Sequence, residues 1–491
     1  MQIWSNQVTV RQANSYSYGK IPPFHPNEKY PELSGLPREY DLSNTVYDGI
    51  RQLFFDSKYD LEAWETPWWN PLGWLIRPGM TVVLKPNLVR HYNDRGESIE
   101  GLITQGAIIR AVIDYVYLAL DGKGRIIVAD APQDDANFQA IEAYIGIRAI
   151  QQLYKETFGF EVEFYDLRQD ESTKIDGVVV ERRKLVGDPC GYRIVDLGKE
   201  SAFSEVEAKW QSLYGAGYDT EELQTYHHLG VHKYCISQSV LDADVLINLP
   251  KLKTHKKGGV TLSMKNLVGV IGNKNCLPHH TVGLPCTGGD QFATNSVRNL
   301  LEHYLLRFYK RSFANRNVAS KKIAVPLKNV GQRIFGATDV TIRSGNWYGN
   351  DTVWRAVFDL NRIVIFCDKK GKMAEKQQRG YLSIIDGVVG GEKNGPLACT
   401  NKRAGLLILG QNPVDTDIVA CHCIGFVPSK IPVIRKTIER NLLGRPQGEK
   451  ILYECFLNGQ CVTLNEIKPR IGIQFVPHMG WARVATQGND E

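Results

Sequence analysis

Apolar residues recur along the chain with two periods, and the alternation between these periods predicts an α/β fold. Short apolar or alternating runs indicate strands at 81–89, 124–130, 160–167, 245–249, 381–386 and 405–410. Apolar positions at helical spacing indicate helices at 105–120, 137–158, 351–366 and 415–424. A strand, a helix and a second strand in this order form a right-handed crossover between parallel strands. We therefore expect a mostly parallel sheet flanked by helices.

Two stretches depart from this rhythm. The first stretch is the N-terminal region, which shows no sustained period and suggests an extended arm. The second carries Gly288-Gly289 and a basic helical run over about 300–316, and we interpret it as an inserted cap or subdomain. The predicted organisation is an N-terminal arm at 1–40, the first part of the α/β core at 41–272, the cap at 273–350, the resumed core at 351–450 and a C-terminal extension at 451–491.

Composition narrows the class of protein. Hydrophobic residues make up 43% of the 491 residues and charged residues 23%, which is typical of a folded chain. The net charge of +6 is small for this length and disfavours a nucleic-acid partner, which would need a dense basic stripe. Ten cysteines without a disulfide framework suit reduced thiols in a cytoplasmic protein. No apolar run is long enough for a membrane span, and the N-terminus lacks a secretory leader.

The densest group of reactive side chains follows the strand at 245–249. We expect Pro250 to end this strand, and the next residues are Lys251-Leu-Lys-Thr-His-Lys-Lys-Gly-Gly259. On composition alone such a lysine run is a solvated loop. The embedded Thr254 and His255, the flexible glycines and a charge at Lys265 inside an apolar segment favour an anion-binding loop instead.

Polar residues also follow the other predicted strands. If the strands are parallel, these side chains meet at one edge of the sheet, where α/β proteins bind their ligands. Three carboxylates at this edge, from Asp130, Asp386 and Asp417, would hold Mg²⁺ or Mn²⁺ together with an anionic substrate. Structural alternatives are open for these segments too, with Asp130 and Asp386 as turn residues and Asp415 as a helix N-cap.

The remaining candidates are given roles by their chemistry. His255 either shuttles a proton, with a pKa near neutrality, or only donates a hydrogen bond to substrate. Trp347, Asn350 and Arg355 offer a stacking surface and polar contacts to a sugar or base, or simply pack at a helix start. The predicted catalytic residues are His255, Lys253 and Lys265. The predicted substrate-binding residues are Lys85, Asn87, Lys251, Thr254, Asn266, Trp347, Asn350 and Arg355.

Several blocks resemble a known bacterial family, the domain of unknown function 362. They are Lys85-Pro-Asn-Leu, Val128-Ala-Asp-Ala-Pro, Ile247-Asn-Leu-Pro-Lys-Leu-Lys-Thr-His, Lys265-Asn-Leu-Val-Gly, Ile385-Asp-Gly with Gly395-Pro, and Asp415-x-Asp417. Their order matches over roughly residues 80 to 425. The resemblance implies a fold and a site without supplying a reaction. Some relatives carry ferredoxin-like cysteine runs, but no Cys-x-x-Cys-x-x-Cys occurs here, which disfavours an iron–sulfur cluster bound in that manner.

The sequence thus favours a cytoplasmic enzyme that binds a phosphorylated or carboxylated small molecule, with a sugar-linked one as our guess. Cations around a developing oxyanion suit group transfer at a phosphoryl or glycosyl centre. Motifs of P-loop NTPases, Rossmann dehydrogenases, α/β-hydrolases and zincin proteases are missing. One alternative is a non-catalytic module that binds a polyanion or a protein. Another is a redox or metal-cofactor role like that of the iron–sulfur relatives.

Overall fold

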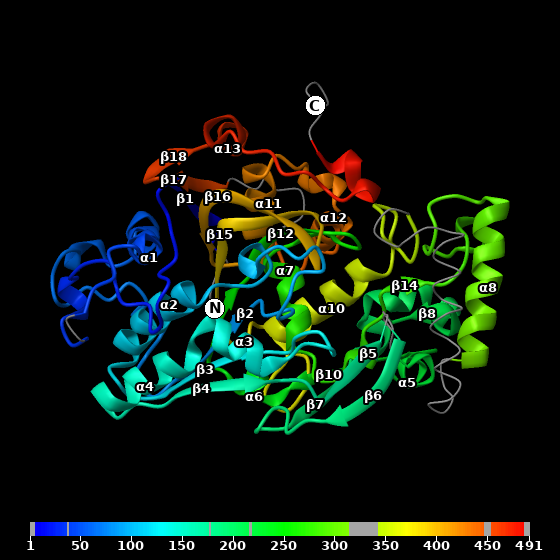
Figure 1. Cartoon of the computed structure of the whole chain (residues 1–491), viewed down its shortest axis with the longest axis horizontal. Coiled ribbons are helices and arrows are strands. Elements are labelled where there is room, and N and C mark those ends of the chain that lie inside the picture. The colour runs from blue at the N-terminus through cyan, green and yellow to red at the C-terminus, as the bar shows by residue number, and fades with distance from the viewer. Residues whose placement is uncertain are drawn as a thin grey trace.

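A computed structural model describes residues 5–36, 39–175, 178–215, 219–313, 342–445 and 453–485. Its main sheet runs in the order β18-β17-β1-β16-β15-β11-β2-β3-β4, with β12 attached to β15 and β13 attached to β12 (Figure 1). The strands of this sheet are β1 (Gln7–Gln12), β2 (Thr81–Pro86), β3 (Arg125–Asp130), β4 (Val162–Asp166), β11 (Val245–Leu249), β12 (Lys251–His255), β13 (Gly259–Thr261), β15 (Gly380–Asn394), β16 (Ala398–Gly410), β17 (Glu454–Leu457) and β18 (Gln460–Val462).

Helices and small sheets surround the main sheet. The helices are α1 (Thr45–Asp56), α2 (Gly106–Leu120), α3 (Phe138–Ile145), α4 (Ile147–Phe158), α5 (Thr220–Tyr226), α6 (Gln238–Asp242), α7 (Ser263–Asn266), α8 (Val297–Phe313), α10 (Val353–Phe366), α11 (Pro413–Cys423), α12 (Pro432–Glu439) and α13 (Leu464–Ile471). The small sheets pair β5 (Asp170–Ile175) with β6 (Val178–Lys184), β8 (Leu213–Tyr214) with β14 (His280–Thr281), and β10 (Val231–Ser237) with both β7 (Tyr192–Asp196) and β9 (His227–His228).

The predicted α/β fold is confirmed. Strands β15, β11, β2, β3 and β4 are parallel to one another, whereas β16 pairs antiparallel with β15 and β1. Alternate residues of β2 enter two different cores: Val82 and Leu84 pack with α1 and α2, and Val83 packs against the opposite face. Both faces of the parallel half are therefore buried, which explains its nearly continuous apolar strands.

Some boundaries differ from the sequence-based expectations. The predicted helix at 137–158 is two helices, because Gly146 between them has a left-handed backbone with φ of 63°. Helix α11 begins at Pro413 and is capped by Asn412, whose side chain accepts from the Asp415 backbone N–H at 2.8 Å. The acid considered as a cap therefore lies inside the first turn.

Both ends of the chain contribute strands to the main sheet. Strand β1 lies in the region interpreted as an extended arm, and it pairs with β16 on one side and β17 on the other. Val8 and Val10 of this strand are fully buried. One short strand lacks the sustained period that the sequence analysis required, so it was missed. The domain boundaries themselves stay a prediction.

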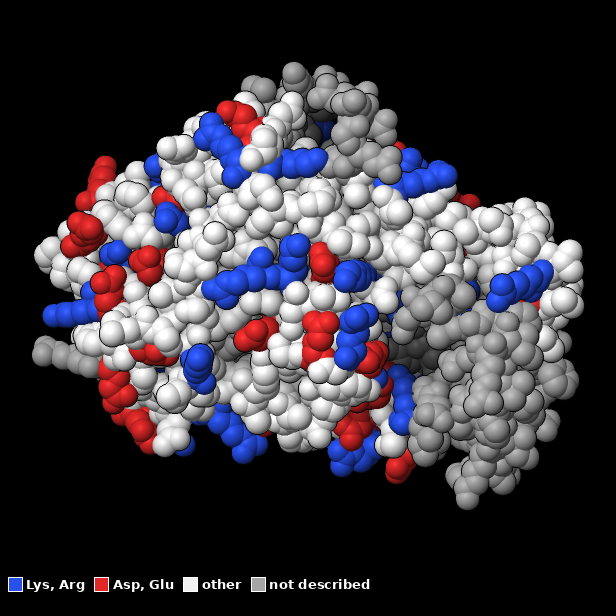
Figure 2. All heavy atoms as spheres, turned by 45° about the horizontal axis from the view of Figure 1, so that its top comes forward, with Lys and Arg blue, Asp and Glu red and all other residues white. Residues whose placement is uncertain are grey.

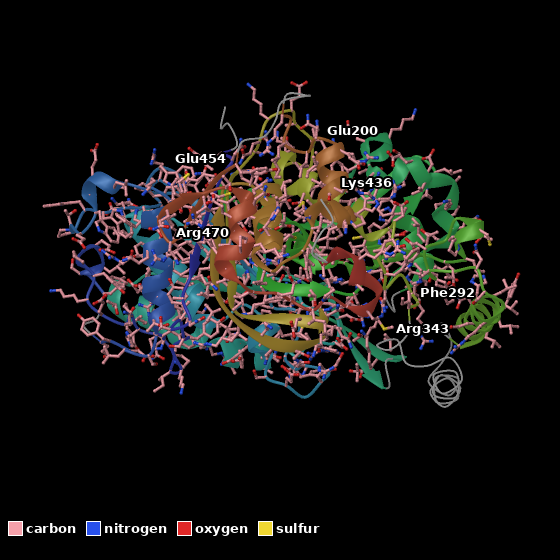
Figure 3. All side chains as sticks on the ribbon, turned by 90° about the horizontal axis from the view of Figure 1, so that it is seen from above. Glu200, Phe292, Arg343, Lys436, Glu454 and Arg470 are labelled. Carbon is pink, nitrogen blue, oxygen red and sulfur yellow. The ribbon has the colours of Figure 1, made fainter. Side chains whose placement is uncertain are left out.

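The predicted cap is described in part. Helix α8 stands at the edge of the molecule in Figure 1 and accounts for the basic helical run as far as Phe313. Residues 314–341, including the predicted end of that run, lie outside the described residues. From above, Phe292 and Arg343 lie toward the same end of the molecule as α8 (Figure 3). Among the described helices, none has the length and apolar character needed to cross a membrane.

Candidate functional site

The lysine block forms a buried strand, and the expectation of a loop there is wrong. Pro250 separates β11 from β12, yet β12 continues along β15, with Lys251 opposite Asp386 and Lys253 opposite Gly391. Leu252 packs into the apolar core. Because side chains alternate along a strand, the lysines face away from that core. Both lysine residues are nevertheless completely buried.

A cavity of about 90 Å³ lies where several elements converge. The ends of β2 and β3, strands β12 and β13, helix α7 and the segment after it all contribute to its walls. The lining includes Lys85, Asn87, Asp130, Lys253, His255, Thr261, Lys265, Asn266, Gly269, Lys274 and His279. Four of the lining residues are lysines, and the one carboxylate among them belongs to Asp130.

Buried hydrogen bonds hold the first part of this wall rigid. Lys85 Nζ donates to Asp130 Oδ1 at 2.6 Å, and the other oxygen of this carboxylate accepts from the Leu88 backbone N–H at 2.7 Å. Asn87 Nδ2 donates to Asn266 Oδ1 at 2.7 Å. Lys253 Nζ donates to Asn87 Oδ1 at 2.7 Å. The two asparagines therefore link β2, β12 and α7 into one polar network.

Lys265 and Lys274 line the cavity with few polar contacts to offset the burial of their positive charges. Lys274 Nζ donates to the Ala131 carbonyl at 2.8 Å, while Lys265 makes no hydrogen bond to any described residue. Burial lowers the pKa of each amine to about 8, and for Lys265 the charge of Lys274 lowers it further. Burial also lowers the pKa of Lys253 to about 7. A large share of these amines is thus uncharged at mildly alkaline pH.

His255 is held as a neutral hydrogen-bond donor. Its Nδ1 accepts from the Lys257 and Gly258 backbone N–H groups at 3.0 and 3.1 Å, so the proton of the neutral ring is on Nε2. Burial, followed by the charges of Lys265 and Lys253, lowers the pKa of His255 well below its ordinary value. This differs from the expected pKa near neutrality, and it favours the hydrogen-bonding alternative for this ring.

Gly269 is needed for the close packing of the wall. A Cβ atom at this position would overlap Asp130 Oδ1 and Lys85 Nζ. The Gly269 carbonyl also accepts from the Ala131 backbone N–H at 2.9 Å. The turn after α7 can therefore press against the ends of β2 and β3 only because this residue lacks a side chain.

The three acids expected to hold a metal ion are used differently. Asp386 Oδ2 accepts from Lys251 Nζ at 2.8 Å, and its Oδ1 accepts from the Tyr18 hydroxyl at 2.6 Å. Asp417 accepts from the backbone N–H groups of Ser263 and Met264 at the start of α7, and burial raises its pKa to about 7. No group of three or more His, Cys, Asp or Glu side chains in the described parts of the chain could hold a metal ion. The Mg²⁺ or Mn²⁺ site stays a prediction without a ligand set.

Other predicted binding residues support the framework. Thr254 donates to the Lys393 carbonyl at 2.9 Å. Asn350 Oδ1 accepts from the Val353 backbone N–H, at the first residue of α10, at 2.9 Å. Arg355 is tied to Asp351 and Glu205. Trp347 donates to the Asp290 carbonyl at 2.8 Å. Neither these side chains nor that of Lys251 lines the cavity.

The structure thus brings together half of the predicted site and adds residues that were missed. The predicted residues in the lining are Lys85, Asn87, Asp130, Lys253, His255, Lys265 and Asn266. Thr261, Lys274 and His279 were missed as site residues. A signal for Lys274 exists, because it is an isolated charge between apolar Val270-Ile271 and Cys276-Leu277, as Lys265 is in its own segment.

The fold and site define an α/β protein with a buried cationic cavity at the carboxyl ends of its parallel strands. Residues 185–422 match the model of the family described as Domain of unknown function (DUF362), so this part of the chain is a domain of that family. The match includes β11, β12, α7 and the turn after it. It begins after β2 and β3, so Lys85, Asn87 and Asp130 lie outside the matched residues.

Two further likenesses are limited in extent. A thylakoid-associated protein of Synechocystis is 40% identical over 60 residues, which cover 12% of this chain and 17% of that protein. The chain thus matches under a fifth of that relative. A crystal structure of a Thermotoga maritima protein covers 74% of this chain and 55% of its own, with 8% identity and a TM-score of 0.27. At that score the likeness carries no argument.

Proposed function

We propose that the cavity binds the anionic group of a phosphorylated or carboxylated small molecule, and that the protein is an enzyme acting on that molecule. One observation carries the proposal: four lysines line the cavity with a single carboxylate, and that carboxylate is already paired with Lys85. The remaining amines therefore provide positive charge that the described residues of the lining do not neutralise.

Burial makes this excess of charge significant. A buried ammonium without a counter-charge is costly, and the lowered pKa values of Lys253, Lys265 and Lys274 reflect that cost. An anion that entered the cavity would offset it and raise all three pKa values. The cavity is far smaller than the roughly 300–1,000 Å³ of pockets that enclose a whole drug-sized ligand. It suits the charged end of a substrate.

The same groups support transfer chemistry. Lysine ammonium groups and the Nε2–H of His255 can stabilise negative charge that develops on a reacting oxygen in a site with little water. Phosphoryl or glycosyl transfer is the reaction class that we propose, with a sugar-linked substrate as the preferred example and Mg²⁺ or Mn²⁺ as an optional partner of the substrate anion. The free thiols of all ten cysteines suit the cytoplasmic location that forms part of the proposal.

The arrangement of charges gives less support to a polyanion-binding module. On the face shown in Figure 2, blue basic and red acidic side chains are interspersed. The lysines without a counter-charge that support the proposal lie in the cavity instead, and Lys253 among them is completely buried. A long polyanion contacts exposed lysines, whereas a small anion can enter a cavity.

Sulfate binding tests the proposal, because sulfate stays doubly charged across the pH range of interest. We expect sulfate to raise the melting temperature at pH 6.5, since a ligand at a hundred times its Kd adds about 2.7 kcal/mol of stability. Deprotonation of Lys253, Lys265 and Lys274 removes positive charge as the pH rises. The affinity measured by calorimetry should therefore fall steadily between about pH 7 and pH 9.

Matched variants localise the effect. Lys265→Ala should weaken sulfate binding by at least about tenfold, the expected loss for one charge-assisted contact of about 1.5–3 kcal/mol. Lys123→Ala removes an exposed lysine and should change nothing, because that side chain is 71% exposed. Equal binding by both variants, or no binding of sulfate or phosphate at pH 6.5, would refute the proposed anion site. If Lys265→Ala loses both sulfate binding and the catalytic turnover of a phosphorylated substrate, the protein is established as an enzyme that acts at this site.

A further inference from the structure

Lys265 differs from the other lysines of the cavity. Lys85 donates to Asp130, Lys253 to Asn87 and the Leu102 carbonyl, and Lys274 to the Ala131 carbonyl. The Lys265 amine has no such partner among the described residues, although the side chain lines the cavity. Gly258 leaves room for its stem, since a Cβ there would lie 3.1 Å from Lys265 Cδ. The Lys265 amine thus lies at the cavity and has no hydrogen-bond partner among the described residues.

The residues around Lys265 supply the other groups that addition of its amine to a carbonyl compound needs. A second cation, Lys274, lines the same cavity and depresses protonation of Lys265, and a desolvated lysine beside another cation is a recognised way to make an amine nucleophilic. His255 can donate from Nε2 to a carbonyl oxygen. Thr261 Oγ1 is buried without a described hydrogen-bond partner, so it can accept or donate a proton at the adduct.

We infer that Lys265 is a nucleophile that forms an imine with the carbonyl carbon of a small anionic carbonyl compound, either an oxo acid or the phosphate of a keto sugar. This inference rests on the proposed anion site, because the other lysines would hold the carboxylate or phosphate. The substrate class thereby narrows to anions that also carry an aldehyde or ketone.

The step balances without any further reactant. The Lys265 nitrogen lone pair forms a bond to the carbonyl carbon, and the carbonyl π electrons move to oxygen, which accepts a hydrogen bond from His255 Nε2–H. One proton of the nitrogen passes through the Thr261 hydroxyl to this oxygen and gives a neutral carbinolamine. The second nitrogen proton passes to the carbinolamine hydroxyl, which leaves as water when the carbon–nitrogen double bond forms. One water leaves for each imine, and a later hydrolysis reverses the step and frees the amine.

Reductive trapping tests the inference on the intact protein. Pyruvate and dihydroxyacetone phosphate serve as separate probes at pH 8 with cyanoborohydride, and peptide mass spectrometry locates the adduct. We expect one adduct per chain, on Lys265, with a mass increase equal to the mass of the probe less one oxygen, because one water is lost and two hydrogens are gained on reduction. The probe that labels faster distinguishes a carboxylate from a phosphate source. Inorganic phosphate should suppress the reaction by occupying the cavity.

The pH profile and variants separate a specific site from general lysine reactivity. Labelling of Lys265 should rise to a plateau above about pH 8, whereas an exposed lysine keeps rising toward about pH 10.4. Lys265→Arg should abolish the adduct, and Lys123→Arg should leave it unchanged. Site mapping in the unmodified sequence keeps the test valid if the arginine variant fails to fold.

Three outcomes are decisive. A single adduct on Lys265 that phosphate suppresses supports the inference. No adduct, or equal labelling of many lysines, overturns it, and if sulfate still binds the proposed anion site stands. No adduct together with no binding of sulfate or phosphate overturns both.

Discussion

Lys85 and Asp130 form the best-buried ion pair of the cavity wall, with 0% and 3% of their side chains exposed. Asp130→Ala would leave the Lys85 ammonium buried without its counter-charge and would also remove the acceptor of the Leu88 N–H. Because breaking a buried pair from one side costs about 3–5 kcal/mol, we expect a loss of that size in the free energy of unfolding. Urea denaturation at pH 7 measures it.

An exposed pair provides the matched comparison. Arg435 and Glu439 are one helical turn apart in α12, 3.9 Å from each other and about half exposed. Arg435→Ala should cost less than about 1 kcal/mol, because water screens such pairs. A similar loss in both variants would mean that burial does not govern the Lys85–Asp130 interaction.

At the scale of elements, the site depends on how closely the turn at Leu267–Val270 approaches β2 and β3. Gly269→Ala would place a methyl group on Asp130 Oδ1 and Lys85 Nζ. Overpacking of this kind costs about 1–3 kcal/mol, and displacement of the turn should also carry Lys265 and Asn266 out of position. We expect reduced stability in urea denaturation together with weakened sulfate binding in calorimetry.

Gly35 offers a control for the substitution itself. A Cβ at Gly35 would make only an ordinary contact of 3.9 Å with Phe158. Gly35→Ala should therefore leave stability within about 0.5 kcal/mol and sulfate affinity unchanged. If Gly269→Ala behaves in the same way, the turn does not need the close approach described above.

At the scale of the whole molecule, the N-terminal strand joins β16 to the C-terminal hairpin of β17 and β18. Strand β1 pairs with β16 and β17, and Tyr18 further along hydrogen-bonds Asp386 beside Lys251. Deletion of residues 1–13 would expose both neighbouring strand edges and the core that Val8 and Val10 fill.

We expect this deletion to abolish the cooperative thermal transition seen by circular dichroism and to produce aggregates on gel filtration. Ile21→Ala, at an N-terminal side chain that is 76% exposed, is the control, with an unchanged melting temperature expected. A cooperative transition after the deletion would show that the sheet is stable without its N-terminal strand.

The sequence by itself determined the elements whose signals are local. The strand at 245–249, the helix beginning near 105 and the strand beginning near 124 each carry an apolar period over their full length, and all appear in the structure. The positions of Lys85 and Asp130 at the ends of predicted strands were enough to bring them to one site, because parallel strands end at a common edge. The family resemblance rested on the same blocks.

Only the tertiary structure decided how each polar side chain is used. Asp130, Asp386 and Asp417 look alike in the sequence, yet one faces the cavity, one pairs with Lys251 and one caps α7. The lysine block became a buried strand because β15 extends past Pro250 and offers a second partner. Strand β1 could not be predicted for a related reason, because its pairing partners lie hundreds of residues away in the sequence. Side-chain pairing and strand addition depend on distant contacts, and a local pattern carries no information about them.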